Sequence, residues 1–311
     1  MQKLLVFDIS NMLYRTFFAN KKNHSPEESA GLAHHSALIT LNKYYRTFKP
    51  TKVVMAFDRT SWRKAYTADE LCISKKPYKG NRRQNMTPAE KEMFERFLNH
   101  VNEFETMMTK KTSVICLAGD GLEADDLVAG LCDVFTDDEI IIVSADKDLM
   151  QLLRSPNVSL IDPATGKDRR ALLNADFDGD VDYFMFEKCI RGDAGDNVQS
   201  AFPGVRKTRI KKAYVDPFEK VNLMNETWSI GEPGSDEFVE HRVKDLFAEN
   251  QLLMDLKEQP DIIKDRMKLT IDTALDEPGT YSHFDFLKFL GKYELKKIVE
   301  QVDNFVPMLS R

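Results

Sequence analysis

Short apolar segments alternate with helical patterns over the first two thirds of the chain, and this alternation is the strongest constraint on the fold. The apolar segments are expected to be β-strands: Leu4–Phe7, Val53–Phe57, Val114–Leu117, Glu139–Val143 and, more weakly, Val158–Ile161. Continuous apolar strands separated by helices are typical of a parallel sheet that helices cover on both faces. We therefore expect an α/β fold for this part of the chain.

Helices are indicated between these strands by caps and by periodicity. One is expected to begin near Ser10, and a longer one lies within Ser29–Phe48. The segment 87–90 is a capping box with proline at the first helical position. Apolar residues follow it at helical spacing and are assigned to the core: Phe94, Phe97, Leu98, Val101, Phe104 and Met108.

The last third of the chain differs from the rest. From Asp182 onward strand signals vanish and helical patterns dominate, and the Gly/Pro loop Ser229–Asp236 interrupts them. We therefore predict two domains, an α/β domain over residues 1–181 and a helical region over residues 182–311.

Composition excludes several classes of protein. The chain has 311 residues, of which 42% are hydrophobic and 30% charged, as in an ordinary soluble protein. Its net charge of −6 argues against a globally basic nucleic-acid coat but leaves room for local basic patches. No apolar run is long enough to span a membrane, and no signal peptide fits the N-terminus. The four cysteines form no CxxC pair, so we expect free thiols in a cytoplasmic protein and no zinc site.

Acidic residues follow each of the first four predicted strands, and they are the sharpest functional signal. They are Asp8 after the first, Asp58 after the second, Glu123, Asp125 and Asp126 after the third, and Asp146 and Asp148 after the fourth. Parallel strands would bring them to one edge of the sheet, where α/β proteins bind ligands. Any one of them alone is more often a helix cap or a turn residue.

Together, so many carboxylates would repel one another unless cations neutralised them. Oxygen ligands with no cysteine or histidine nearby select hard ions such as Mg²⁺, with Mn²⁺ as a substitute, over zinc. Two such ions close together are a recurring device for hydrolysing phosphodiesters. The acids therefore predict a two-metal site.

Two basic segments could hold a nucleic acid. Arg59–Arg83 contains eight Lys/Arg and only two acids, and Trp62, Tyr66 and Tyr78 lie among the cations. Such a segment suits a phosphate backbone with unpaired bases, although a solvated surface loop is the alternative. The second segment carries five cations, Arg206, Lys207, Arg209, Lys211 and Lys212, with no acid between residues 204 and 214.

The chain resembles the 5′-nuclease (flap endonuclease) superfamily, and most closely its free-standing phage type, which includes phage RNase H enzymes and 5′→3′ exonucleases. The resemblance runs from residue 1 to about residue 215. It rests on Asp8 with Ser10-Asn11, Asp58, and the motifs GLEADD (121–126), SADKDL (144–149) and GDAGDN (192–197). It implies a PIN-like nuclease core, two divalent metals, and hydrolysis of single-stranded 5′ ends or flaps beside a duplex. Family members remove RNA primers during replication.

The resemblance also implies roles for individual acids. Asp8, Asp58, Glu123 and Asp125 match the acids nearest the more tightly held metal. Asp146, Asp148, Asp193 and Asp196 match the second cluster, and Asp126 could serve either metal through water.

The resemblance assigns the basic residues to the substrate. Residues 59–86 match the arch or clamp region, whose base contains Tyr78, Lys79, Arg82 and Arg83. Lys79 would contact the scissile phosphate and stabilise the transition state, and Tyr78 would stack on a base. Arg15 matches a phosphate-contacting position, although a surface role suits it nearly as well.

The family's helix–hairpin–helix, which grips duplex phosphates, is degenerate here. The hairpin reads Pro203–Thr208, one residue short and without its second glycine. The missing glycine argues against a bound K⁺. Duplex binding by Arg206, Lys207, Lys211 and Lys212 is retained.

These features predict a metal-dependent 5′-nuclease that acts on DNA with a 5′ flap or single-stranded 5′ end and on RNA–DNA hybrids, with Lys79, Asp146 and Asp148 as catalytic residues. The alternatives are a PIN-like ribonuclease and a non-catalytic, structure-specific DNA-binding protein. We expect a monomer in the cytoplasm (the host's, if a phage encodes it), with no membrane contact. A sliding clamp and a single-strand-binding protein are candidate partners. The tail Asn304–Leu309 is either a clamp-binding peptide or, the commoner case, a buried terminus.

Overall fold

The chain forms two compact units, each assembled from separate segments of the sequence. The structure is a computed structural model that describes residues 1–21, 23–84, 86–231 and 238–310. Unit 1 comprises Met1–Thr60, Met86–Ala171 and Ile262–Arg311, and unit 2 comprises Ser61–Asn85 and Leu172–Asp261. These units divide the chain differently from the predicted domains of residues 1–181 and 182–311, which remain a prediction.

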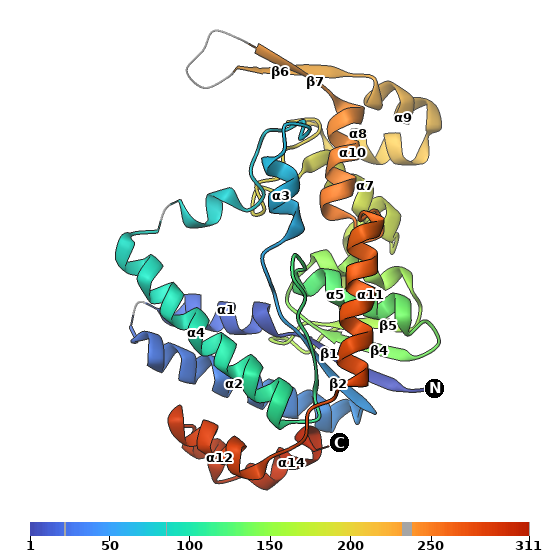
Figure 1. The fold of residues 1–311 in the computed structure, drawn as a ribbon. Helices are drawn as coiled ribbons and strands as arrows, with labels where there is room; N and C mark the ends of the chain where they lie inside the picture. Colours follow the sequence, from blue (N-terminus) through green and yellow to red (C-terminus); the bar gives the residue numbers. More distant parts are fainter. Residues whose placement is uncertain (22, 85, 232–237, 311) are drawn as a thin grey trace. The chain divides into compact units, whose positions relative to one another are not determined.

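A five-stranded sheet forms the centre of unit 1 (Figure 1). Its strands are β1 (Lys3–Asp8), β2 (Lys52–Ala56), β3 (Ile115–Leu117), β4 (Glu139–Val143) and β5 (Val158–Ile161). They lie in the order β3-β2-β1-β4-β5, and every neighbouring pair is parallel. The predicted parallel sheet and its five strands are therefore confirmed.

The register of this sheet aligns the carboxyl ends of its central strands. Asp8 of β1 lies opposite Ala56 of β2, and Phe7 lies opposite Val143 of β4. From β1 the chain builds outward through β2 and β3 on one side, then returns to place β4 and β5 on the other. The strand order thus reverses between the neighbouring strands β1 and β4. Ligands of α/β proteins bind beyond the carboxyl ends of the strands at such a point.

Helices of unit 1 cover both faces of the sheet. They are α1 (Ile9–Asn20), α2 (Pro26–Phe48), α4 (Pro88–Lys111), α5 (Ala124–Val134), α12 (His283–Lys292), α13 (Lys296–Val299), α14 (Val306–Leu309), nearly all of α11 (Asp261–Asp276), and the 3₁₀ turns η2 (Asp148–Arg154) and η3 (Val302–Asn304). Leu5 and Phe7 pack in one core cluster with residues of α1, α2, α4 and α12. Helix α5 contacts β1 and β2 from the other side, because successive strand residues face opposite ways.

The predicted capping box and apolar face of α4 are confirmed. Thr87 accepts a hydrogen bond from the Glu90 backbone, and the Glu90 side chain accepts one from the Thr87 backbone. The predicted core positions of this helix are all buried except Leu98, which is partly buried and packs against the cluster.

The C-terminal tail is part of the core of unit 1. Phe305, Met308 and Leu309 are buried in the cluster, and the carbonyl of Leu309 accepts a hydrogen bond from the Ser113 backbone. The interpretation of this tail as a buried terminus is confirmed. None of the described helices combines the length and apolar character that crossing a bilayer requires.

Unit 2 is mainly helical. It contains α3 (Trp62–Ala68), the 3₁₀ turn η1 (Gly80–Arg83), most of α6 (Arg170–Phe177), α7 (Val181–Arg191), α8 (Lys207–Val215), α9 (Pro217–Met224) and α10 (Val243–Met254). Tyr183, Phe186, Ile190, Ile210 and Leu246 belong to its own core cluster. Helices α7 and α8 pack together, and Gly204 between them has a φ of +72°. The predicted helix–hairpin–helix at this place stays a prediction.

The expectation that strands vanish after Asp182 is wrong. Strands β6 (Thr227–Gly231) and β7 (Phe238–Arg242) form an antiparallel pair in which Thr227 lies opposite Arg242. Strand β6 includes Ser229–Gly231, the first three residues of the predicted Gly/Pro loop, and the rest of that loop, residues 232–236, lies outside the described chain. A two-stranded ribbon buries little, so its sequence need not be apolar; it is anchored by the Trp228 indole, which donates a hydrogen bond to the Ala201 carbonyl.

Candidate metal centre and nucleic-acid interface

Seven of the predicted metal ligands lie in unit 1, at the carboxyl edge of the parallel sheet. We call this set the acidic edge: Asp8, Asp58, Glu123, Asp125, Asp126, Asp146 and Asp148. Asp8 ends β1, Asp58 lies two residues beyond β2, and Asp146 lies three residues beyond β4. The three acids after β3 stand at the start of α5. The sheet therefore gathers acids from four strands, as the sequence predicts.

Asp8 is the most constrained member of the acidic edge. It is buried, one carboxylate oxygen accepts a hydrogen bond from the Asn11 backbone at 3.1 Å, and the other accepts one from Ser144 Oγ at 2.9 Å. Burial, together with repulsion by Asp58 and Asp146, raises the pKa of Asp8 to about 7 despite these hydrogen bonds. Asp8 is thus a cap of α1 and also the centre of an anionic cluster, so the two interpretations hold together.

Two serines position the carboxylates. Ser144 Oγ donates to Asp8 and accepts from the Asp146 backbone N–H at 3.0 Å, so it links β1 to β4 across the strand reversal. Ser10 Oγ accepts from the Asp58 backbone N–H at 2.9 Å. Sequence reasoning gave these serines no role of their own. The available signal was their place two residues from Asp8 and from Asp146 in the quoted motifs.

The start of α5 concentrates negative charge. Carboxylate oxygens of Glu123, Asp125 and Asp126 lie within 4.8 Å of one another. The Asp58 carboxylate accepts a hydrogen bond from the Ala124 backbone N–H at 2.8 Å and so also joins this helix start. Asp126 is fully buried and accepts from the Glu123 backbone at 2.9 Å, which makes it a helix cap. The free backbone N–H groups at a helix start stabilise nearby carboxylates. A single acid is enough to cap a helix, so capping alone does not account for three acids here.

The donor set fits a hard divalent cation. Every side chain of the acidic edge offers oxygen, and both burial and the neighbouring negative charges raise the pKa of Asp8. A cation such as Mg²⁺ or Mn²⁺ would remove that repulsion and suits carboxylate ligands. Asp8, Asp58, Glu123 and Asp125 are the residues that would hold it.

The other two predicted metal ligands lie in unit 2, in one turn. Asp193 accepts from the backbone N–H groups of Gly195 and Asp196, and its carboxylate lies 3.5 Å from Lys188 Nζ. Asp196 accepts from the Tyr78 hydroxyl at 2.9 Å, lies 3.7 Å from Lys79 Nζ, and pairs with Arg82. Burial alone would raise the pKa of Asp196, but Lys79 and Arg82 outweigh it and hold that pKa below its usual value. Within unit 2 both carboxylates therefore already have cations beside them.

Lys79 is held by a dense local network in unit 2. Its backbone is left-handed, with φ at +55°, and its N–H donates to the Asp196 carbonyl at 2.8 Å. Tyr78 beside it is only 4% exposed, so its predicted stacking on a base stays a prediction. Beneath Tyr78 lies Arg63, which is buried, donates to the Leu253 carbonyl at 2.6 Å, and sits over the rings of Trp62 and Tyr78.

Arg63 is a residue that sequence reasoning missed, because it counted only as one cation of a basic segment. The remaining predicted contacts are exposed: Arg15 lies on the surface of α1 and Arg82 on η1, whereas the side chain of Arg83 lies outside the described part of the chain.

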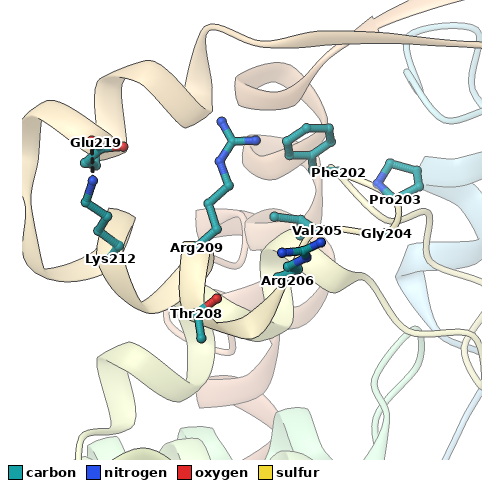
Figure 2. A pocket seen from close by; sticks show the side chains of 9 residues that line it. All are labelled: Phe202, Pro203, Gly204, Val205, Arg206, Thr208, Arg209, Lys212 and Glu219. Carbon is teal, nitrogen blue, oxygen red and sulfur yellow. Dashed lines mark hydrogen bonds and ion pairs between the residues drawn. The ribbon is translucent and has the colours of Figure 1, made fainter.

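The second basic segment forms an exposed patch on α8, and acids of unit 2 accompany it. Lys211 pairs with Asp178 at 2.6 Å, Lys212 with Glu219 at 2.7 Å, and Lys207 lies 3.8 Å from Glu187. These acids lie outside residues 204–214, so the sequence alone did not pair them with the lysines. Figure 2 shows the neighbouring pocket of about 640 Å³, with the Lys212–Glu219 pair at its rim. Phe202, Gly204 and Arg206 are among the residues that line it.

Comparison with known proteins identifies relatives that match most of the chain or its first part. Residues 3–178 match the family model of the 5′-3′ exonuclease N-terminal resolvase-like domain. A 5′-3′ exonuclease of Bacillus subtilis (strain 168) is 27% identical over 266 residues, which cover 80% of this chain and 82% of that protein. The DNA polymerase I of Caldicellulosiruptor bescii is 30% identical over 155 residues, 49% of this chain but 16% of the polymerase.

Solved structures share the fold. A complex of a bacteriophage T5 flap endonuclease with DNA and metal ions superposes with a TM-score of 0.62 at 20% identity, covering 88% of this chain and 98% of that one. A T5 5′-exonuclease with bound zinc ions gives a TM-score of 0.61 at 20% identity, covering 89% and 99%.

The pKa of Asp8 predicts how the metal-free protein responds to pH. Asp8 is protonated in the folded state up to a pKa of about 7, against 3.8 for an ordinary aspartate, so its contribution to stability is complete below pH 4 and lost by about pH 7. In a chelator, the free energy of unfolding of the wild type minus that of Asp8→Asn should fall over this window. The comparison with Asp8→Asn isolates this group, because buried His34, whose pKa is lowered to about 3 by burial, changes stability in the opposite direction over much of the same range. The exposed Asp137→Asn should leave the wild-type profile unchanged.

The contribution of Mg²⁺ binding to the free energy of unfolding should instead rise with pH, because the carboxylates that bind the ion must be deprotonated. At one hundred times its dissociation constant it should add about 2.7 kcal/mol to the free energy of unfolding. A metal-free profile whose change from pH 4 to pH 7 is the same in the wild type and in Asp8→Asn would contradict this account of Asp8.

Proposed function

The chain belongs to the 5′-3′ exonuclease family, a family of phosphodiester hydrolases, and on this basis we propose that it is a divalent-metal-dependent, structure-specific 5′-nuclease that acts on DNA. Its membership and its PIN-like α/β core agree with the predicted resemblance to the 5′-nuclease superfamily. The observation that carries the proposal is the acidic edge, where acids from four strands meet at the strand reversal and where burial and neighbouring carboxylates raise the pKa of Asp8.

We propose that the acidic edge holds catalytic metal. Divalent ions bound there would supply Lewis-acid polarisation of the scissile phosphate. Asp8, Asp58, Glu123 and Asp125 would hold the first ion. Asp146 and Asp148 would serve a second, and the assignment of Asp193 and Asp196 to that ion stays a prediction of the family resemblance. The chain's own contribution is orientation: Ser144 holds the Asp8 carboxylate, Ser10 holds the Asp58 backbone, and Asp8 would bind a cation in its deprotonated form.

We infer the substrate class from the basic residues. The Arg59–Arg83 segment, with Lys79 and Arg82, suits an unpaired strand, and the exposed lysines of α8 suit a duplex. This combination supports DNA with a 5′ flap or single-stranded 5′ end, and RNA–DNA hybrids in RNA primer removal. A monomer in the cytoplasm, and replication proteins as partners, remain part of the proposal.

A single assay separates this function from its alternatives. Cleavage of 5′-labelled DNA flap, nicked duplex, RNA–DNA hybrid and RNA is measured with Mg²⁺ and with a chelator. The proposal expects Mg²⁺-dependent cleavage near the 5′ end of the DNA and hybrid substrates. Cleavage of RNA alone would favour a PIN-like ribonuclease, and binding without cleavage would favour a DNA-binding protein.

Asp146→Asn and Asp148→Asn should each abolish cleavage and leave DNA binding intact. An asparagine can still accept the Asp148 backbone hydrogen bond that Asp146 accepts at 2.9 Å, so the turn should survive while a metal ligand is lost. Removing a negative charge should not hinder the binding of the DNA phosphates. Gel shift and single-turnover cleavage on the same preparations test this, with Asp137→Asn as the control. A variant that cuts at the wild-type rate would remove its residue from the site.

Lys79→Ala should lower the single-turnover rate by about 10²–10³-fold while weakening binding much less, because a transition-state contact is lost. Alanine adds no new backbone strain at φ +55°, since lysine is strained there equally, and Arg82 still pairs with Asp196. Lys79→Arg should keep part of the rate. A change confined to the dissociation constant would make Lys79 a positioning contact.

The patch on α8 generates a prediction about salt. Changing Lys207, Lys211 and Lys212 together to Ala should weaken duplex-containing substrates more than single strands. Each lost phosphate contact should flatten the slope of log affinity against log salt by about 0.9. The double variant Asp178→Asn and Glu219→Gln should act oppositely, because it frees Lys211 and Lys212 from their present partners.

K⁺ and Na⁺ at equal ionic strength should give similar affinities in these experiments. An unchanged slope in the triple variant would mean that the patch has no part in duplex binding. A K⁺ preference abolished by altering Gly204 would show that the shortened hairpin binds the ion.

A further inference from the structure

A groove lies between two helices of unit 1, α4 and α12. It encloses about 750 Å³, and it is lined by residues of both helices and by none of the acidic edge. Met107 and Phe289 form an apolar part of its wall; Met107 belongs to the core cluster and Phe289 packs against it while remaining partly exposed. The two helices pack against each other, so both walls of the groove belong to the same unit (Figure 1).

The rim of this groove is positively charged in a protein whose net charge is negative. Four lysines line it, Lys110, Lys111, Lys288 and Lys292, against two acids, Glu103 and Asp285. Each acid already has a lysine partner: Lys292 lies 2.6 Å from Glu103, and Lys111 lies 3.0 Å from Asp285. Within the described chain Lys110 and Lys288 form no ion pair of their own, so two positive charges remain at the rim.

The groove is open where α12 carries its glycine. A Cβ placed on Gly291 would meet no atom within 4 Å. Gly291 shares a helix face with Lys288 and Phe284, at spacings of three and seven, and Phe284 is 74% exposed. The exposed phenyl ring extends the apolar surface beyond the groove. A single exposed apolar residue is ordinary, whereas an apolar wall bordered by four lysines and only two acids is complementary to a specific kind of ligand.

We propose that this groove docks an acidic segment of a partner protein that carries a large apolar side chain. The apolar side chain would cover Met107 and Phe289, which is worth about 1.5–3 kcal/mol for a fully buried residue. Acidic side chains of the segment would pair with Lys110 and Lys288 and set its orientation more than its affinity. A nucleic-acid backbone would match the lysines but offers no aliphatic or aromatic side chain for the wall, so the groove favours a peptide.

The probe is a fluorescein-labelled twelve-residue peptide of aspartate and glutamate around two phenylalanines, measured by fluorescence anisotropy with the full chain. The proposal expects saturable binding with a dissociation constant below about 1 mM. Replacing both phenylalanines by serine, or the acids by lysine, should weaken binding by at least about tenfold. Absence of saturable binding, or equal binding of the serine peptide, would overturn it.

Two variants locate the binding on the protein. Lys110→Glu with Lys288→Glu reverses the rim charge, and Gly291→Leu fills open space while favouring the helix, so it should fold. Each of these variants should weaken binding of the peptide by at least about tenfold. The matched control, Lys167→Glu with Lys264→Glu, makes the same change in net charge at exposed sites away from the groove. An equal loss in the control would reduce the effect to net charge and overturn the proposal.

Two further measurements separate this groove from the nuclease site. Cleavage of a free DNA flap should be unchanged in both groove variants, because none of the altered residues belongs to the acidic edge or to the α8 patch. The second measurement adds single-stranded or duplex DNA to the bound peptide. If DNA displaces the peptide and DNA binding is reduced in the groove variants as much as peptide binding is, the groove is a nucleic-acid site and the peptide proposal is overturned. Failure of the nuclease proposal would leave these binding results untouched.

Discussion

The mutual repulsion of carboxylates at the carboxyl edge of the sheet is the constraint on which the rest of unit 1 depends. Asp8 ends the central strand, is buried, and faces Asp58 and Asp146, so its charged form is disfavoured. The protein stabilises this arrangement with hydrogen bonds from Ser144 and from the Asn11 backbone, and by bringing the Ala124 N–H of α5 to Asp58. These contacts hold the acids in place but do not cancel their charge, which is the property a divalent cation requires.

Some of the residues proposed as metal ligands also stabilise helix starts. Asp8 caps α1, and Asp126 accepts from the backbone at the start of α5. A carboxylate held in this way would have its rotamer fixed before an ion bound, which would lower the entropic cost of binding. Unit 2 solves the opposite problem: Asp196 is surrounded by Lys79, Arg82 and the Tyr78 hydroxyl, so its negative charge is balanced and orders the base of the basic segment.

Much of this could be predicted, because the strands and the acids that follow them are local in sequence. The five strands lie within a residue or so of their predicted bounds, and the capping box of α4 formed as its four residues specify. The β6–β7 ribbon was missed because a two-stranded hairpin needs no apolar face. Ser10 and Ser144 were present in the motifs and Arg63 in the basic segment, but the role of a hydroxyl or guanidinium group depends on neighbours that are distant in sequence.

That acids gather at one edge of a parallel sheet follows from local sequence, since strand period and strand ends are properties of neighbouring residues. Which charges meet depends on the tertiary structure. Arg82 pairs with Asp196 across 114 residues, and Lys211 with Asp178 across 33. The lysines of α8 look unopposed along the chain yet have acidic partners in space. Coulomb energy depends on distance through space, which no one-dimensional pattern records.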